Sequence, residues 1–154
     1  MDGTLYKLML VIHIVSVALW LGSNFAMGLG SGSAAGASSE VNAWWAELQG
    51  YLGKTLKNVA FVLLLVTGIV MITSSDKVFE FKNPFVSIGF LTVIIGGALG
   101  GMVFAPGCRS IAEDSRNGDT AAAKKTIDKL GMFGMAESLL VVVTIFFMVF
   151  KWGN

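Results

Sequence analysis

Four long runs of apolar residues constrain the fold of this chain more than any other feature. The first run, 8–29, contains no Asp, Glu, Lys or Arg, and as an α-helix it would cover about 33 Å at 1.5 Å per residue. Because the hydrocarbon core of a bilayer is about 30 Å thick, a helix of this length crosses it. The other runs are 56–73, 85–104 and 130–150. We therefore expect an all-α integral membrane protein, a four-helix bundle that forms one domain over residues 1–154.

The composition agrees with this class and excludes others. Of the 154 residues, 55% are hydrophobic and only 14% are charged, whereas soluble domains carry about 25% charged residues. The net charge of +1 gives no electrostatic support for nucleic acid as a partner, so the lipid bilayer is the expected partner. The single cysteine, Cys108, can form neither an internal disulfide nor a thiolate cluster for zinc or iron–sulfur.

The first connection combines a small-residue stretch with an amphipathic segment. Residues 30–39 consist entirely of Gly, Ser and Ala, which favour loops. Apolar residues then recur with helical spacing and predict a short amphipathic helix before the second span. These residues are Val41, Trp44, Trp45, Leu48 and Leu52. Two placements remain open for this helix: in the membrane–water interface, which favours tryptophan, or packed on the bundle on the soluble side.

The other two connections are predicted from proline and charge. Residues 74–83 are polar, and Pro84 follows them at what would be a first helical position, where proline is tolerated. Pro106 and its neighbouring glycine predict the end of the third span. Residues 108–129 are then expected to form a charged loop with a helix-like centre.

Basic residues near the spans predict the orientation. Since basic residues accumulate on the cytoplasmic side, both termini are expected outside. Lys7 alone precedes a first run that is too long for a signal peptide, so this span is expected to be retained. The connections after spans one and three hold Lys54, Lys57, Arg109, Arg116, Lys124, Lys125 and Lys129, and the opposite side holds Lys7, Lys77, Lys82 and Lys151.

Small residues at four-residue spacing predict where the helices approach one another. Gly96/Gly100 and Gly97/Gly101 form two overlapping pairs in the third span, and this spacing lets membrane helices come close. The first span repeats the spacing with Gly22, Ala26 and Gly30. Packing within the bundle is favoured over dimerisation, because a four-helix protein needs its own close contacts first.

Two strongly ionisable residues, His13 and Glu137, lie well inside the predicted spans, and such residues are functional candidates because they are costly in lipid. By helical rise, His13 lies about 8 Å below the outer surface and Glu137 about 10 Å from the inner one. They are therefore not expected to be partners. Lys57 is expected near enough to the end of its span to extend into the headgroups.

The surroundings of Glu137 are predicted from depth. It should lie level with Ser23 and Asn24 of the first span and with Gly96 and Gly97 of the third. We expect a protonated carboxyl group that donates a hydrogen bond to an amide or carbonyl, and a structural role is favoured over a proton or ion relay.

Candidate ligands for a metal or cofactor include histidine and methionine. The face of the first span that carries His13 also carries Trp20 and Asn24. A hydrogen bond from the imidazole to Thr67 or a backbone carbonyl competes with ligation of haem or a metal by His13. Eight methionines admit copper(I), although methionine also fills apolar cores. No motif for soluble-type catalysis is present, so an enzyme is not the favoured prediction.

Three short segments carry a resemblance to a known family. His13-Ile-Val-Ser-Val-Ala-Leu-Trp-Leu-Gly22, Val66-Thr-Gly-Ile-Val-Met71 and Met148-Val-Phe-Lys-Trp-Gly153 resemble an uncharacterised bacterial family of four-helix integral membrane proteins. That family is distantly similar to the copper-resistance protein D domain and to HemJ-type protoporphyrinogen oxidase. The resemblance implies a multi-pass protein of the bacterial inner membrane.

The resemblance also implies candidate haem ligands. In HemJ-type enzymes a first-helix histidine is paired with a lysine at the start of the third helix, and the corresponding positions here are His13 and Lys82. Depth adds Met71 and Met148 as alternative second ligands, with Trp20 along a porphyrin edge. Three functions follow as predictions: binding of haem or a metal through His13, a non-catalytic accessory or assembly subunit of a membrane complex or homo-oligomer, and a small copper or ion permease.

Overall fold

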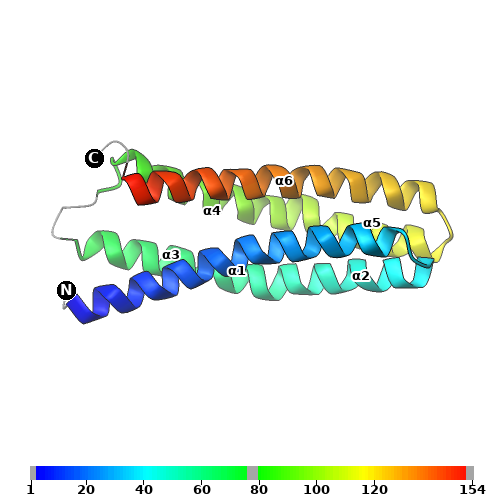
Figure 1. Cartoon of the computed structure of the whole chain (residues 1–154), viewed down its shortest axis with the longest axis horizontal. Coiled ribbons are helices and arrows are strands. Elements are labelled where there is room, and N and C mark those ends of the chain that lie inside the picture. The colour runs from blue at the N-terminus through cyan, green and yellow to red at the C-terminus, as the bar shows by residue number, and fades with distance from the viewer. Residues whose placement is uncertain (1–2, 76–79, 152–154) are drawn as a thin grey trace.

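The computed structural model describes residues 3–75 and 80–151, and it forms a bundle of four long helical rods (Figure 1). Each rod is long and apolar enough to cross a membrane. This confirms the predicted all-α bundle with four spans. Two rods are single helices, and each of the other two contains a short π-helical segment. In chain order the elements are α1 (Gly3–Ala35), α2 (Ser39–Leu52), η1 (Gly53–Lys57), α3 (Asn58–Thr73), α4 (Pro84–Leu99), η2 (Gly100–Phe104), α5 (Ala105–Arg116) and α6 (Thr120–Phe150).

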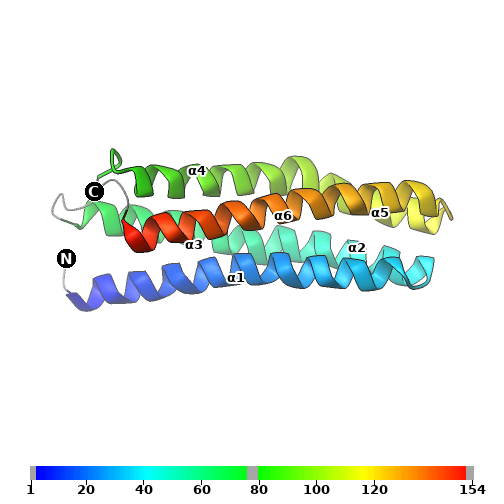
Figure 2. The same cartoon turned by 45° about the horizontal axis from the view of Figure 1, so that its top comes forward.

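The rods run up and down, so the bundle has two distinct ends. At the end that we call the terminal end, α1 and α4 begin and α3 and α6 end (Figure 1). At the other, which we call the distal end, α1 turns into α2 and α5 turns into α6 (Figure 2). The main packing contacts are α2 with α5, α1 with α3, α5 with α6, and α4 with α6.

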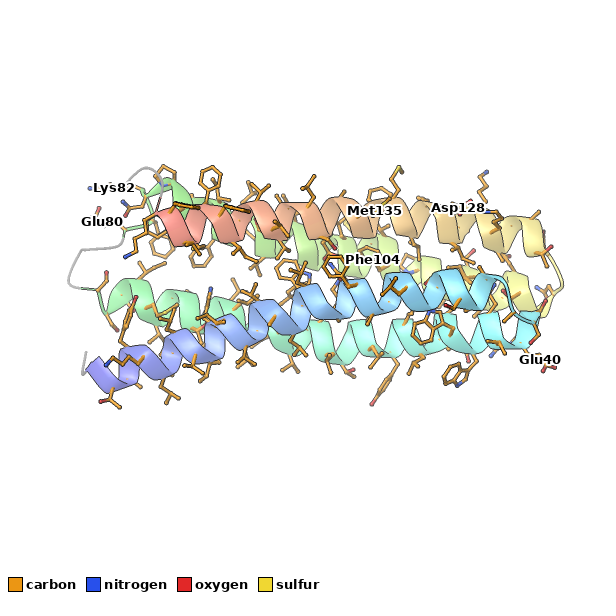
Figure 3. The ribbon with its side chains drawn as sticks, viewed as in Figure 1. Glu40, Glu80, Lys82, Phe104, Asp128 and Met135 are labelled. Carbon is orange, nitrogen blue, oxygen red and sulfur yellow. The ribbon has the colours of Figure 1, made fainter. Side chains whose placement is uncertain are left out.

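The rods are longer than a membrane is thick. The 33 residues of α1 cover about 50 Å, whereas the hydrocarbon core is about 30 Å thick. Most charged residues lie toward the distal end, where Glu40 and Asp128 are seen, while Glu80 and Lys82 mark the terminal end (Figure 3). We therefore expect the distal parts of the rods, including α2 and α5, to extend beyond the lipid, and we call the remainder of the rods, from η1 and η2 to the terminal end, the spanning part.

Two apolar clusters hold the rods together. One lies in the spanning part and centres on Trp20, Phe61 and Val141, with the rings of Trp20 and Phe61 edge to face at 4.6 Å. The other lies in the distal part and is made of small residues of α2 and α5 with Ile111. Such close packing of alanine faces lets α2 and α5 approach each other outside the membrane.

The predicted loops 30–39 and 108–129 are mostly helical, so these two expectations are wrong, although the helix-like centre expected in the second is confirmed as the start of α6. The turn between α1 and α2 is short, and Ser38 caps α2 by accepting from Val41 N at 3.3 Å. The turn between α5 and α6 uses Gly118 at φ 77°, and Asp119 caps α6 through Ala122 N at 2.9 Å. Small or charged residues continue these helices because the helices still pack on one another beyond the bilayer.

The third span was predicted to end at Pro106, and this prediction is wrong. The helix passes through η2 and continues as α5 to Arg116. A proline removes one helical hydrogen bond and crowds the carbonyl group four residues earlier. The wider π-helical turn directly before Pro106 relieves that crowding and lets the rod continue.

The amphipathic helix before the second span is confirmed, and the structure decides its placement. α2 packs against α5 and α1 instead of lying flat in the interface. Trp45 donates from its indole nitrogen to Ser31 Oγ at 3.3 Å, whereas Trp44 is 59% exposed. The two neighbouring tryptophans therefore face different surroundings.

The glycine prediction is correct for Gly96 and Gly30 and wrong for most of the others. A Cβ atom on Gly96 would overlap the ring of Trp20, and one on Gly30 would overlap the ring of Trp45. At Gly97, Gly100, Gly101 and Gly22, in contrast, a Cβ atom would meet nothing within 4 Å. The small-residue spacing therefore marks one close contact in the third span, while the remaining glycines face open space.

Some predictions fall outside the described residues. They concern Lys77, one of the basic residues that predict the orientation, and Trp152 and Gly153, which belong to the third segment of the family resemblance.

Candidate ligand-binding site in the membrane

Glu137 of α6 is the centre of a buried polar cluster in the spanning part of the bundle. Its Oε1 accepts from Trp20 Nε1 at 3.1 Å and from Lys57 Nζ at 3.0 Å. Its Oε2 accepts from Asn24 Nδ2 at 3.0 Å and from Lys57 Nζ at 2.9 Å. The carboxylate thus receives donors from α1 and η1. We call Trp20, Asn24, Lys57 and Glu137 the Glu137 cluster.

The depth prediction for Glu137 is confirmed in part. Asn24 contacts it, and a Cβ atom on Gly96 would lie 3.3 Å from Oε1. The expectation that its carboxyl group donates a hydrogen bond is wrong. Indole and ammonium groups can only donate, so Trp20 and Lys57 require Glu137 to accept, as an ionised carboxylate does.

The expectation that Lys57 extends into the headgroups is also wrong. Its side chain is 7% exposed and forms an ion pair with Glu137. Its ammonium group also lies 4.9 Å from the centroid of the Phe104 ring and 5.9 Å from that of Phe61. Pairing and ring contacts of this kind offset part of the large cost of removing a charge from water.

The helical periodicity explains why Lys57 points inward. Lys57, Phe61 and Leu64 follow each other at i, i+4 and i+7 and share one face of η1 and α3. Phe61 and Leu64 are buried in the core cluster. Because this apolar face packs in the core, Lys57 at the end of the same face also points into the bundle. There its ammonium group pairs with the carboxylate of Glu137.

A large cavity begins beside the Glu137 cluster and extends toward the distal end. Its volume is about 1510 Å³, and Asn24, Lys57 and Ser138 are among its lining residues. Residues of all four rods line it. Phe104, another lining residue, lies near the middle of the bundle (Figure 3). The cavity therefore spans from the membrane interior to the protruding part.

The cavity exists because glycines line it. A Cβ atom would meet nothing within 4 Å at eight lining positions: Gly28, Gly32, Gly53, Gly97, Gly100, Gly101, Gly131 and Gly134. Exposed apolar side chains of α1 and α6 also line the cavity, among them Leu29 and Met135. At the surface, the cavity is therefore bordered by exposed apolar side chains of α1 and α6.

His13 belongs to a separate polar contact closer to the terminal end. Its Nδ1 lies 2.8 Å from Thr67 Oγ1, and that hydroxyl donates to Leu63 O at 2.6 Å. Because the hydroxyl proton is used for Leu63, Nδ1–H donates to Thr67 and the lone pair lies on Nε2. Within residues 3–75 and 80–151, no hydrogen bond is recorded for Nε2. The two ionisable groups, His13 and Glu137, are thus not partners, as expected.

The other sequence-predicted ligands lie in different surroundings. Trp20 is in the Glu137 cluster. Met71 is half-buried on α3, one turn beyond Thr67. Met148 packs against Gly89 of α4. Lys82 is exposed and paired with Glu80 at 2.7 Å. The structure thus brings His13 into contact with Thr67. In a separate place, it brings Asn24 into contact with Glu137.

Sequence reasoning missed Lys57 and the cavity. The i, i+4, i+7 spacing of Lys57 with two core residues was a usable signal. The cavity had no comparable signal, because the spacing of the glycines does not reveal which of them face a neighbouring helix.

Comparison of the chain with models of known protein families, with curated proteins and with solved structures finds no match.

Proposed function

We propose that this small integral membrane protein binds a lipid-soluble molecule in the cavity between its helices. The observation that carries the proposal is the position of the cavity, which is bordered by exposed apolar side chains of α1 and α6 on one side and by the Glu137 cluster on the other. A large apolar pocket with a few convergent polar groups is the usual form of a ligand site. A ligand would enter from the bilayer between α1 and α6.

The two π-helical segments support this assignment. η1 and η2 contribute Lys57 and Phe104, which contact each other beside the cavity. Gly53 and Gly100, the first residues of the two segments, also line it. Single π-helical turns inside α-helices occur frequently at functional sites, because they cost hydrogen-bond geometry and re-aim side chains. Here both π-helical segments, η1 and η2, line the same cavity.

Native mass spectrometry of the detergent-purified protein tests the proposal. We expect wild type to retain a lipid or other lipid-soluble molecule from its membrane. Gly100→Leu should lose that molecule, because an isobutyl group at this lining position would occupy part of the cavity. The substitution itself should be tolerated by the fold, since a Cβ atom at Gly100 meets no protein atom within 4 Å. Gly22→Leu is the matched control, since its Cβ position is also open but it does not line the cavity. Equal retention in wild type and Gly100→Leu contradicts the proposal.

A second function, binding of haem through His13, is supported by the tautomer that Thr67 imposes. With Nδ1 donating to Thr67, Nε2 carries the lone pair that an iron ligand needs. Within the described ranges no three His, Cys, Asp or Glu side chains gather for a metal ion. Haem, which needs only one or two protein ligands, therefore suits His13 better.

Absorption spectroscopy tests this second function. The protein expressed with haem available should show a Soret band, and His13→Ala should lose it while remaining folded. A metal assay on the same sample covers a bare ion. A folded wild-type protein that is colourless and free of metal contradicts binding at His13.

A further inference from the structure

We propose that the ligand of the cavity is an acidic lipid with acyl chains, whose negatively charged headgroup lies at Lys54 and Arg109. This inference rests on the binding function proposed above and adds the chemical class of the ligand. It is carried by the size of the cavity, by the charges that remain unpaired in its lining, and by their position relative to the membrane.

The size favours a molecule with long chains. Pockets for drug-sized ligands have volumes of about 300–1,000 Å³, and the cavity here exceeds that range at about 1510 Å³. It is also elongated along the rods, because it is lined by Asn24 and Val142 in the spanning part and by Arg116 at the distal end. A long amphiphile fits this shape better than a compact ring system.

Most charges in the lining are neutralised by ion pairs. Lys57 pairs with Glu137, Arg116 with Glu47, and Asp128 with Lys124. The structure records no ion pair for three lining residues of the described chain, which are Lys54, Arg109 and Glu113. Two cations and one anion remain, so the unpaired charge of the lining is positive.

The position of these charges places a headgroup. Lys54 precedes Lys57 by one turn toward the distal end and is exposed. Arg109 lies on α5 one turn closer to the membrane than Glu113. The two cations therefore lie nearer the spanning part than the remaining anion, which favours a headgroup at the boundary of that part. Attraction between basic residues and acidic lipids is worth about 1 kcal/mol per residue near the surface.

The spanning part of the cavity suits the chains. Phe25, Leu139 and Val142 line it there together with Gly97 and Gly101. Exposed Phe25 and Leu139 face the lipid as well. A lipid could therefore place its headgroup at Lys54 and Arg109 while its chains lie in the glycine-lined part, in line with those of the bilayer.

The test compares two lipids with identical acyl chains. Phosphatidylglycerol, which is anionic, and phosphatidylcholine, which is zwitterionic, are added separately to delipidated full-length protein, and binding is measured by native mass spectrometry. We expect wild type to bind phosphatidylglycerol about 10-fold more tightly, and the double variant Lys54→Gln/Arg109→Gln to lose this preference while still binding both lipids. Lys125→Gln, which removes an exposed cation away from the cavity, should keep the preference.

The outcomes separate the two proposals. Equal affinity of wild type for both lipids overturns the inference about charge and leaves the binding function intact. A preference that survives in the double variant overturns the assignment to Lys54 and Arg109. Binding of neither lipid overturns the inference, and it overturns the proposed function as well if native wild type also retains no molecule. Gly100→Leu in the same assay should weaken both lipids equally, because it blocks the chains and not the headgroup.

Discussion

Lys57 Nζ lies 2.9 Å from Glu137 Oε2, although the two residues are 80 positions apart in the chain. This ion pair joins the second rod to the fourth in the spanning part of the bundle, and Trp20 and Asn24 add the first rod. Among the described residues no buried side-chain nitrogen or oxygen lacks a partner. The Glu137 cluster is therefore a fully satisfied polar network inside an apolar bundle.

Breaking the ion pair from one side should be costly. Lys57→Met leaves the carboxylate of Glu137 buried without its cation, and the loss of one partner of a buried pair costs about 3–5 kcal/mol. Thermal unfolding in detergent should show a large decrease in stability. The double variant Lys57→Met/Glu137→Gln should recover most of it, because no charge is left unpaired, the glutamine oxygen still accepts from Trp20, and its NH2 group can donate to Asn24 once the Asn24 amide turns over. A double variant no more stable than Lys57→Met would contradict this account.

Neighbouring glycines should respond oppositely to the same substitution. Gly96→Ala places a methyl group into the ring of Trp20, and overpacking of this kind costs about 1–3 kcal/mol. Gly97→Ala meets nothing within 4 Å and should be neutral or slightly stabilising, since alanine favours helix over glycine by up to about 1 kcal/mol. Thermal stability of the two variants decides this, and equal midpoints would show that α1 does not approach α4 at Gly96.

The contact of Thr67 with His13 should affect haem binding if His13 is a ligand. Thr67→Val removes the acceptor that holds Nδ1–H, and loss of such a supporting hydrogen bond lowers affinity by about 10- to 100-fold. Titration with haem, followed by the Soret band, measures this. Thr73→Val is the control, because Thr73 is exposed and its hydroxyl bonds only within its own helix. Unchanged affinity in Thr67→Val would contradict a role for this tautomer.

The orientation with both termini outside stays a prediction. Cys108 is buried and is a poor reporter, so we use Cys108→Ala as the background. Lys82→Cys at the exposed terminal end should react with a membrane-impermeant maleimide in intact cells. Asn117→Cys in the distal turn should react only after permeabilisation. The reverse pattern would invert the orientation.

The resemblance and the haem ligands drawn from it depend on short apolar segments. The structure places His13 where Nε2 is available, yet Lys82 and Met148 make other contacts. Depth along a helix is readable from the sequence because each residue adds about 1.5 Å. The side of the helix that faces a given neighbour is not, because it depends on how the rods are rotated in the bundle.

The sequence by itself determined the four spans and the approximate depths of His13 and Glu137. Lipid offers no hydrogen-bond partners to the backbone, so a run of about 20 apolar residues has to form a helix that spans the membrane. Tertiary structure alone decided that Lys57 pairs with Glu137, that Gly96 is packed while Gly97 is open, and that the distal segments continue as helices. These outcomes depend on contacts between rods that are distant in the chain, and apolar periodicity carries no information about which rod will supply the partner.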